Sequence, residues 1–174
     1  MKSIIVHTQK EMDSIDVDFD GLINVFGKNI IVSKKYLYTT RARKGSQIIA
    51  MENSHIMAYE NTHVLARKNS QVTSWRNSRV TARENSKVMA WQNSQITAWE
   101  NSRITARENS KVIAWGNSHV TAHGNSQVTA YENSRVVACE NSHIVALGNS
   151  QIIAYENSKV ITLGNSKVTW AENI

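Results

Sequence analysis

The residues of this chain best suited to chemistry are arginines, lysines and tryptophans that recur between residues 75 and 115. Guanidinium and ammonium groups pair with phosphates, and exposed aromatic rings stack on bases, so this combination favours single-stranded nucleic acid. Serine recurs in nearly every repeat and therefore marks architecture, and no Ser/His/Asp order or phosphate-binding glycine loop accompanies it. The chain is therefore predicted not to be an enzyme. The candidate anion- or nucleic-acid-binding residues are Arg79, Arg83, Arg103, Arg107, Lys87, Lys111, Trp75, Trp91, Trp99 and Trp115.

From Lys44 onward an eight-residue unit must position these side chains. The unit is x-Asn-Ser-x-(Val/Ile)-x-Ala-x, and it recurs sixteen times. Ser, Val/Ile and Ala alternate with variable residues, which predicts strands with the constant residues inward and the variable residues outward. Asn tolerates the left-handed backbone of a sharp corner, so the pattern predicts an all-β parallel solenoid with Asn at each corner.

The variable residues follow a longer period. Eight of the nine variable positions in residues 71–94 are identical 24 residues later, whereas shifts of eight or sixteen residues give two of nine. We therefore expect a single-chain, three-sided parallel β-helix with three octapeptides, or 24 residues, per coil. Sixteen octapeptides would make about five coils, roughly 25 Å long at a strand spacing of ~4.8 Å.

Three-sided stacking would place four arginines, Arg79, Arg83, Arg103 and Arg107, on two adjacent strands of one face. Like charges ~4.8 Å apart repel unless an anion or a partner acid joins them, which predicts a phosphate or carboxylate site. Lys87, Lys111 and the four tryptophans would flank the same coils. In the alternative interpretation, Glu84, Glu100 and Glu108 neutralise the arginines, and stacked tryptophans only stiffen the coil.

The third of these faces would be more apolar than solvent exposure warrants, since it carries Met89, Ile113 and Val137 facing outward. Such a face is typical of a protein interface.

Residues 1–43 depart from the repeat and are predicted to form a small N-terminal α/β cap, with the solenoid over 44–174. Residues 2–7 resemble a strand, Thr8-Gln9-Lys10-Glu11 fits a capping box that opens a short helix, and residues 22–33 resemble further strand with a turn at Gly27-Lys28-Asn29. Solenoid ends expose apolar core and strand edges, so terminal caps are expected. Ala42 already falls in the Ala position, so the repeat register is expected to begin at Tyr36.

No comparable cap is evident at the other end. The inward Ala becomes Thr162 and then Trp170, whose indole could plug the last coil. If it does not, two chains could meet there end to end as an isologous homodimer, with Trp170 as the oligomer contact.

Composition narrows the function classes. The formal charge is +6, and the position after Ser holds only Gln, His, Arg or Lys, which predicts a basic surface. The single cysteine, Cys139, excludes an intrachain disulfide and is expected at an exposed structural position. Short apolar runs and the lack of a signal-peptide cleavage site predict no membrane partner and a cytoplasmic protein.

No metal or cofactor is expected. His119 and His143 would stack one coil apart in the three-sided coil and could share an ion. His123 would lie ~13 Å along the strand from that pair, too far to complete a site.

The chain resembles the octapeptide-repeat β-solenoid proteins of bacteria and their phages. The resemblance rests on Thr8-Gln9-Lys10-Glu11, on Asp18-Phe19-Asp20-Gly21 and on the tandem units from Lys44. It implies the fold and a phage or prophage setting, and it carries no catalytic motif.

These observations predict a non-enzymatic recognition protein that binds a polyanion, either nucleic acid or a nucleoprotein, and inhibits a host machine. One alternative is a structural, homo-oligomeric spacer or virion component that uses the apolar third face and the last coil as contacts. Another is glycan binding through exposed tryptophans.

Overall fold

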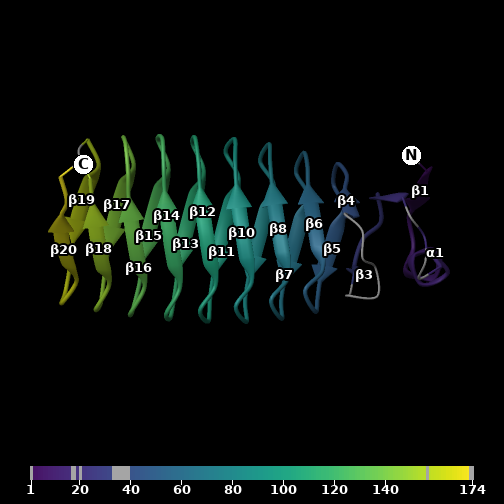
Figure 1. Ribbon diagram of the computed structural model, residues 1–174, viewed down its shortest axis with the longest axis horizontal. Helices are drawn as coiled ribbons and strands as arrows, with labels where there is room; N and C mark the ends of the chain where they lie inside the picture. Colours follow the sequence, from purple (N-terminus) through teal and green to yellow (C-terminus); the bar gives the residue numbers. More distant parts are fainter. Residues whose placement is uncertain (1, 17–18, 20, 33–39, 156, 173–174) are drawn as a thin grey trace.

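The computed structural model of the protein is a long stack of coils with a small helical segment at its N-terminal end (Figure 1). It describes residues 2–16, 19, 21–32, 40–155 and 157–172. All paired strands are parallel, which confirms the predicted all-β parallel solenoid. No helix among these residues is long and apolar enough to cross a membrane.

The N-terminal segment contains the elements predicted for the cap. Strand β1 (Lys2–Val6) leads into helix α1 (Gln9–Asp13), and then come β2 (Gly21–Val25) and β3 (Ile30–Val32). The capping box is present, with Thr8 Oγ1 accepting from the Glu11 N–H and the Glu11 carboxylate accepting from the Thr8 N–H. Strands β2 and β3 already pair with solenoid strands, so the cap continues both sheets.

Two parts of the N-terminal prediction lie outside the described residues, namely Asp18 and Asp20 of the first motif and Tyr36. Ala42 is described, and it pairs with Ala58, as expected if it occupies the Ala position.

The remaining strands alternate between two sheets. The eleven-stranded sheet contains β1, β2 and the even-numbered strands β4 (Thr40–Ala42), β6 (His55–Ala58), β8 (Gln71–Ser74), β10 (Lys87–Ala90), β12 (Arg103–Ala106), β14 (His119–Ala122), β16 (Arg135–Ala138), β18 (Gln151–Ala154) and β20 (Lys167–Trp170). The nine-stranded sheet contains β3 and the odd-numbered strands β5 (Gln47–Ala50), β7 (His63–Ala66), β9 (Arg79–Ala82), β11 (Gln95–Ala98), β13 (Lys111–Ala114), β15 (Gln127–Ala130), β17 (His143–Ala146) and β19 (Lys159–Thr162).

The predicted three-sided coil of 24 residues is wrong. Each solenoid strand pairs with the strand sixteen residues away, as Lys87 with Arg103 and Arg103 with His119. One coil is therefore two octapeptides, and the sixteen repeats make about eight coils, roughly 38 Å long at ~4.8 Å per strand. The 24-residue period is a property of the sequence that the coil does not follow.

The corners explain why two strands close a coil. In the N-terminal half of the solenoid the two corner residues are both left-handed, as in Glu84 (φ 52°) and Asn85 (φ 62°). The N–H of the following Ser86 donates to the carbonyl of Arg83, which closes a tight β-turn around them. Such a turn reverses the chain, so successive strands lie in opposite sheets. A three-sided coil would need a wider corner.

The core lies between the two sheets and consists of stacked Val, Ile and Ala side chains that are almost fully buried. The serines are buried beside it, and most donate their hydroxyl to the carbonyl three residues earlier, as Ser78 does to Trp75 and Ser118 to Trp115. This bond binds the corner to the strand, which accounts for Ser in nearly every unit.

The last coil is much more exposed than the coils before it. Trp170, in an inward position, is 58% exposed, and Ile161 and Leu163 are 59% and 52% exposed. Val160 and Val168 are only partly buried, whereas Ile144 and Ile152 in the preceding coil are buried. Trp170 therefore does not seal this end of the described structure.

Candidate polyanion-binding surface

A row of basic side chains runs along the outer face of the eleven-stranded sheet. Lys87, Arg103, His119 and Arg135 occupy the position after Ser on four successive strands, β10, β12, β14 and β16, and pair in register. All four are exposed. We call them the basic row, which spans about 14 Å at ~4.8 Å per strand.

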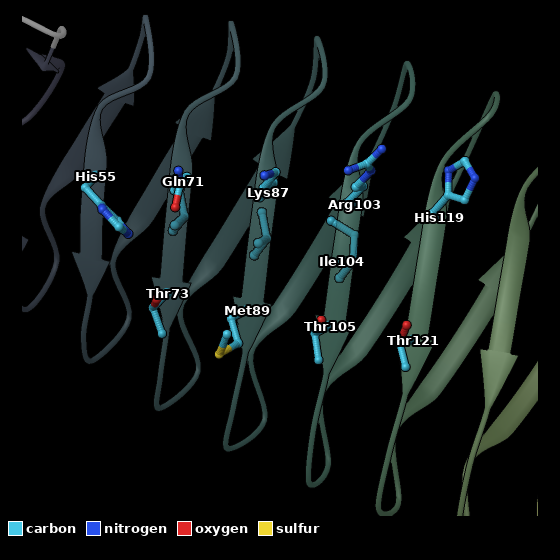
Figure 2. Close-up of a pocket in the computed structure, with 12 residues that line it drawn as sticks. His55, Gln71, Thr73, Lys87, Met89, Arg103, Ile104, Thr105, His119 and Thr121 are labelled. Atoms are coloured by element: carbon cyan, nitrogen blue, oxygen red, sulfur yellow. The ribbon is translucent and has the colours of Figure 1, made fainter.

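A second row accompanies it on the same face. Thr105 and Thr121 lie two residues after Arg103 and His119, and Thr73 and Met89 continue this row toward the N-terminus (Figure 2). This second row lines a shallow groove of about 560 Å³ together with His55, Gln71 and three members of the basic row, Lys87, Arg103 and His119. The groove therefore offers positive charge along one side and hydroxyl groups along the other.

The acids lie at the corners and not on the sheet faces. Four ion pairs occur among the described residues, and all are at corners: Arg67–Glu84 (2.8 Å), Lys68–Glu52 (3.8 Å), Arg76–Glu60 (3.3 Å) and His123–Glu140 (3.7 Å). None includes a member of the basic row. Its cations therefore face solvent without a carboxylate partner in the described structure.

The predicted cluster of four arginines on one face is wrong. Arg79 and Arg83 belong to β9 and its corner in the nine-stranded sheet, whereas Arg103 and Arg107 belong to β12 and its corner in the eleven-stranded sheet. Residues 24 apart are an odd number of octapeptides apart, so they fall on opposite sheets. Of the acids expected to neutralise these arginines, Glu84 pairs instead with Arg67.

Two of these arginines lie over tryptophan rings. The Cζ atom of Arg107 is 4.9 Å from the centroid of Trp91, and that of Arg83 is 5.7 Å from the centroid of Trp99. Cation–π contact therefore holds both guanidinium groups at corners.

The tryptophans form columns along the two corners instead of flanking one site. At the corner after the nine-stranded sheet, Trp115 stacks on Trp99 (5.2 Å, 7°) and on Tyr131 (4.0 Å, 4°). At the other corner Trp75 stacks on Tyr59 (4.8 Å, 7°). Both faces of the Trp115 ring are thus covered, so neither a base nor a sugar can stack on it. This weakens base stacking and glycan binding as roles for the tryptophans and favours the stiffening role.

Of the predicted site residues, the structure keeps Lys87 and Arg103 as neighbours. Lys111 lies instead in β13 of the nine-stranded sheet, where Gln95 separates it from Arg79. The apolar third face is likewise divided, with Met89 and Val137 in one sheet and Ile113 in the other.

Sequence reasoning missed His119 and Arg135 as members of the site. A comparison of the charges, and not the identities, of residues sixteen positions apart would have found both residues. Neighbours in the row are alike in sign but not in residue type.

The described residues do not support a metal site or a nucleophilic cysteine. No group of three or more His, Cys, Asp and Glu side chains there could hold a metal ion, and His119 and His143 lie in opposite sheets. The Cys139 thiol is partly buried, and this burial, followed by the charge of Glu140, raises its pKa. A raised pKa leaves less thiolate and does not suit a nucleophile.

Comparison of the chain with protein-family models, with curated proteins and with solved structures found no match in any of the three.

Proposed function

We propose that this protein is a non-enzymatic recognition protein that binds a polyanion, nucleic acid or a nucleoprotein, through the eleven-stranded sheet. The observation that carries the proposal is the basic row: Lys87, Arg103, His119 and Arg135 on successive strands, exposed and without an ion pair to any described residue. Like charges at this spacing repel one another, and a row of phosphates would convert the repulsion into attraction.

The nine-stranded sheet supplies a matched control. Its position after Ser also carries three cations, Arg79, Lys111 and Lys159, but Gln95 and Gln127 separate them, so no run of basic residues exceeds two strands even when histidine is counted. The two sheets thus offer the same kinds of charge in continuous and interrupted arrangements.

The test compares two triple variants with the wild type by fluorescence anisotropy, using a labelled single-stranded DNA of about twenty nucleotides at low salt. The variant Lys87→Gln, Arg103→Gln, Arg135→Gln is expected to bind about 30-fold more weakly. Arg79→Gln, Lys111→Gln, Lys159→Gln, with the same loss of charge, is expected to change binding by less than about threefold. Undetectable wild-type binding, or equal losses in the two variants, would contradict the proposal.

The same proposal includes a phage or prophage origin for the protein. The capping box at Thr8 and Glu11 and the tandem octapeptides support a relation to phage and prophage octapeptide-repeat proteins. In that setting the protein acts in the cytoplasm of the host cell and inhibits a host machine by occupying its nucleic acid or nucleoprotein.

A second candidate is a homodimer or structural spacer assembled through the last coil. It is favoured by the exposure of Trp170, Ile161 and Leu163 beside the outer edges of β19 and β20. Light scattering on the 174-residue chain tests it. A dimer that Trp170→Ala converts to a monomer is the expected result, and a monomer at high concentration would reject it.

A further inference from the structure

The corners on both sides of the basic row carry the acids of the solenoid together with cations such as Arg67, Arg76 and Arg107. In the strands of the eleven-stranded sheet from β6 to β20, no outward position carries an acid. The acids of the solenoid occupy the position before Asn at each corner. Glu52, Glu84, Glu100 and Glu132 lie at the corner before these strands, and Glu60, Glu108 and Glu140 lie at the corner after them.

Several of these carboxylates are held in place along the corners. Glu132 accepts a hydrogen bond from the Gly116 N–H at 2.9 Å, and Glu140 accepts one from the Gly124 N–H at 2.7 Å. Each bond joins corner residues sixteen positions apart, so it directs the carboxylate along the corner, away from the sheet face. These two carboxylates therefore stay at the corners, which carry cations as well.

We propose that the basic row takes one linear chain of phosphates, a single-stranded nucleic acid lying parallel to the long axis of the solenoid, and discriminates against a duplex. This inference rests on the proposed function and adds the form and direction of the ligand. A single strand needs one row of cations, which the face provides. A duplex brings a second phosphate backbone, about 12 Å away across its major groove. On a face whose outward rows are two residues apart, ~7 Å, that backbone lies over a corner, where cations such as Arg67 and Arg76 are paired with carboxylates and Arg107 lies over a tryptophan ring.

The length of the row sets the length of the bound chain. Beyond Arg135 the same positions are Gln151 and then Lys167, so the cations from Lys87 to Lys167 cover five strand spacings, about 24 Å. Successive phosphates of an extended single strand lie farther apart than the rise of about 3.4 Å per nucleotide in a duplex, so this distance corresponds to at most about seven nucleotides.

Recognition along this line is by the backbone, not the bases. Trp115 has both ring faces covered, and Arg107 lies over Trp91. The second row of the groove supplies the Thr105 and Thr121 hydroxyls, which can donate to phosphate oxygens. Binding is therefore independent of sequence, and a chain of phosphates without bases shares the chemistry.

The experiment measures the affinity of the full chain for oligothymidylates of increasing length, for a duplex of about twenty base pairs and for inorganic polyphosphate of similar length. Affinity is expected to rise steeply up to roughly seven nucleotides and only slowly beyond. The single strand is expected to bind about tenfold more tightly than the duplex, and polyphosphate is expected to compete. Equal or tighter binding of the duplex, or no competition by polyphosphate, overturns the inference.

A pair of double variants tests the direction of the chain. Lys87→Glu with Lys167→Glu puts acids at both ends of the row and is expected to cut affinity about tenfold for long oligomers, but less for those of about four nucleotides. Lys111→Glu with Lys159→Glu makes the same charge change on the nine-stranded sheet and is expected to have little effect. Loss of affinity that does not depend on oligomer length would contradict axial binding. If the wild type binds no polyanion at all, the proposed function itself fails.

Discussion

At the residue scale, Gly148 shows how closely the coils approach at a corner. Its φ is +69°, and a Cβ added there would lie 3.0 Å from the Glu132 nitrogen of the preceding coil. Gly45 has a similar φ of +73°, but a Cβ there would meet no atom within 4 Å. Comparing Gly148 with Gly45 therefore separates the free-energy cost of a left-handed backbone from the cost of a close contact with the neighbouring coil.

Gly148→Ala is therefore expected to destabilise the protein more than Gly45→Ala. The left-handed conformation costs about 1 kcal/mol in either variant, and the close contact adds about 1 kcal/mol or more at residue 148 alone. Urea unfolding followed by circular dichroism measures both variants. Equal destabilisation would show that the corner can widen without cost.

Cys139 offers a second prediction at this scale. Because burial and then the Glu140 charge raise the pKa of the Cys139 thiol above its ordinary value, its thiolate fraction at pH 8 lies below that of an ordinary cysteine. Its reaction with a disulfide reagent is expected to be slower than that of an unstructured cysteine peptide at the same pH. Glu140→Gln should shift the pH dependence of this reaction rate only part of the way toward that of the peptide, since burial is the larger cause of the raised pKa. A rate equal to that of the peptide would refute this.

At the element scale, the stack of Trp99, Trp115 and Tyr131 binds three successive coils along one corner. Trp115 has two ring partners, each worth about 0.5–1.5 kcal/mol beyond the area that it buries. Trp115→Ala is therefore expected to lower the free energy of unfolding by about 2–3 kcal/mol. Trp75→Ala, which removes a ring with one stacking partner among the described residues, Tyr59, is the comparison, and its loss should be smaller by about 0.5–1.5 kcal/mol.

The strands themselves could be predicted from the octapeptide, and their pairing could not. Alternation of Ser, Val/Ile and Ala fixes which side chains point inward, and it correctly places Ala42, Val88 and Ile104 in the core. The number of strands per coil depends instead on the backbone angles of the two corner residues. Asn indicated one left-handed residue, which is correct at Asn85, but at corners of the C-terminal half the residue before Asn is left-handed instead, as at Glu108 and Glu132.

The error in the number of strands per coil also affected the prediction of the candidate surface. A residue type and its outward orientation are local properties, so the exposure of Lys87 and Arg103 was predictable. Which cation lies beside which depends on the coil length, so His119 and Arg135 were missed, and Arg79 was placed beside Arg103 incorrectly.

At the scale of the whole molecule, the coils contact only their neighbours, so the two ends need not be equally stable. The cap covers the first coil, whereas the apolar side chains of β19 and β20 are partly open. Amide hydrogen exchange is expected to be at least about tenfold faster in β19 and β20 than in β17 and β18. Uniform protection along the stack would indicate that the last coil is covered in solution, as by a second chain.

Because the chain reverses at every corner, the sheet that a strand joins depends on whether an odd or an even number of octapeptides precedes it. Loss of one octapeptide, such as residues 108–115, would pass every later strand to the opposite sheet and break the run from Arg103 to Arg135. Loss of two, residues 108–123, would keep every strand in its sheet and bring Arg135 beside Arg103. The first deletion is expected to weaken polyanion binding about as much as the charge-removing triple variant, and the second to preserve it. Because recombination between the near-identical 24-residue stretches adds or removes three octapeptides at a time, such an event would exchange the two outer surfaces beyond it while leaving the core unchanged.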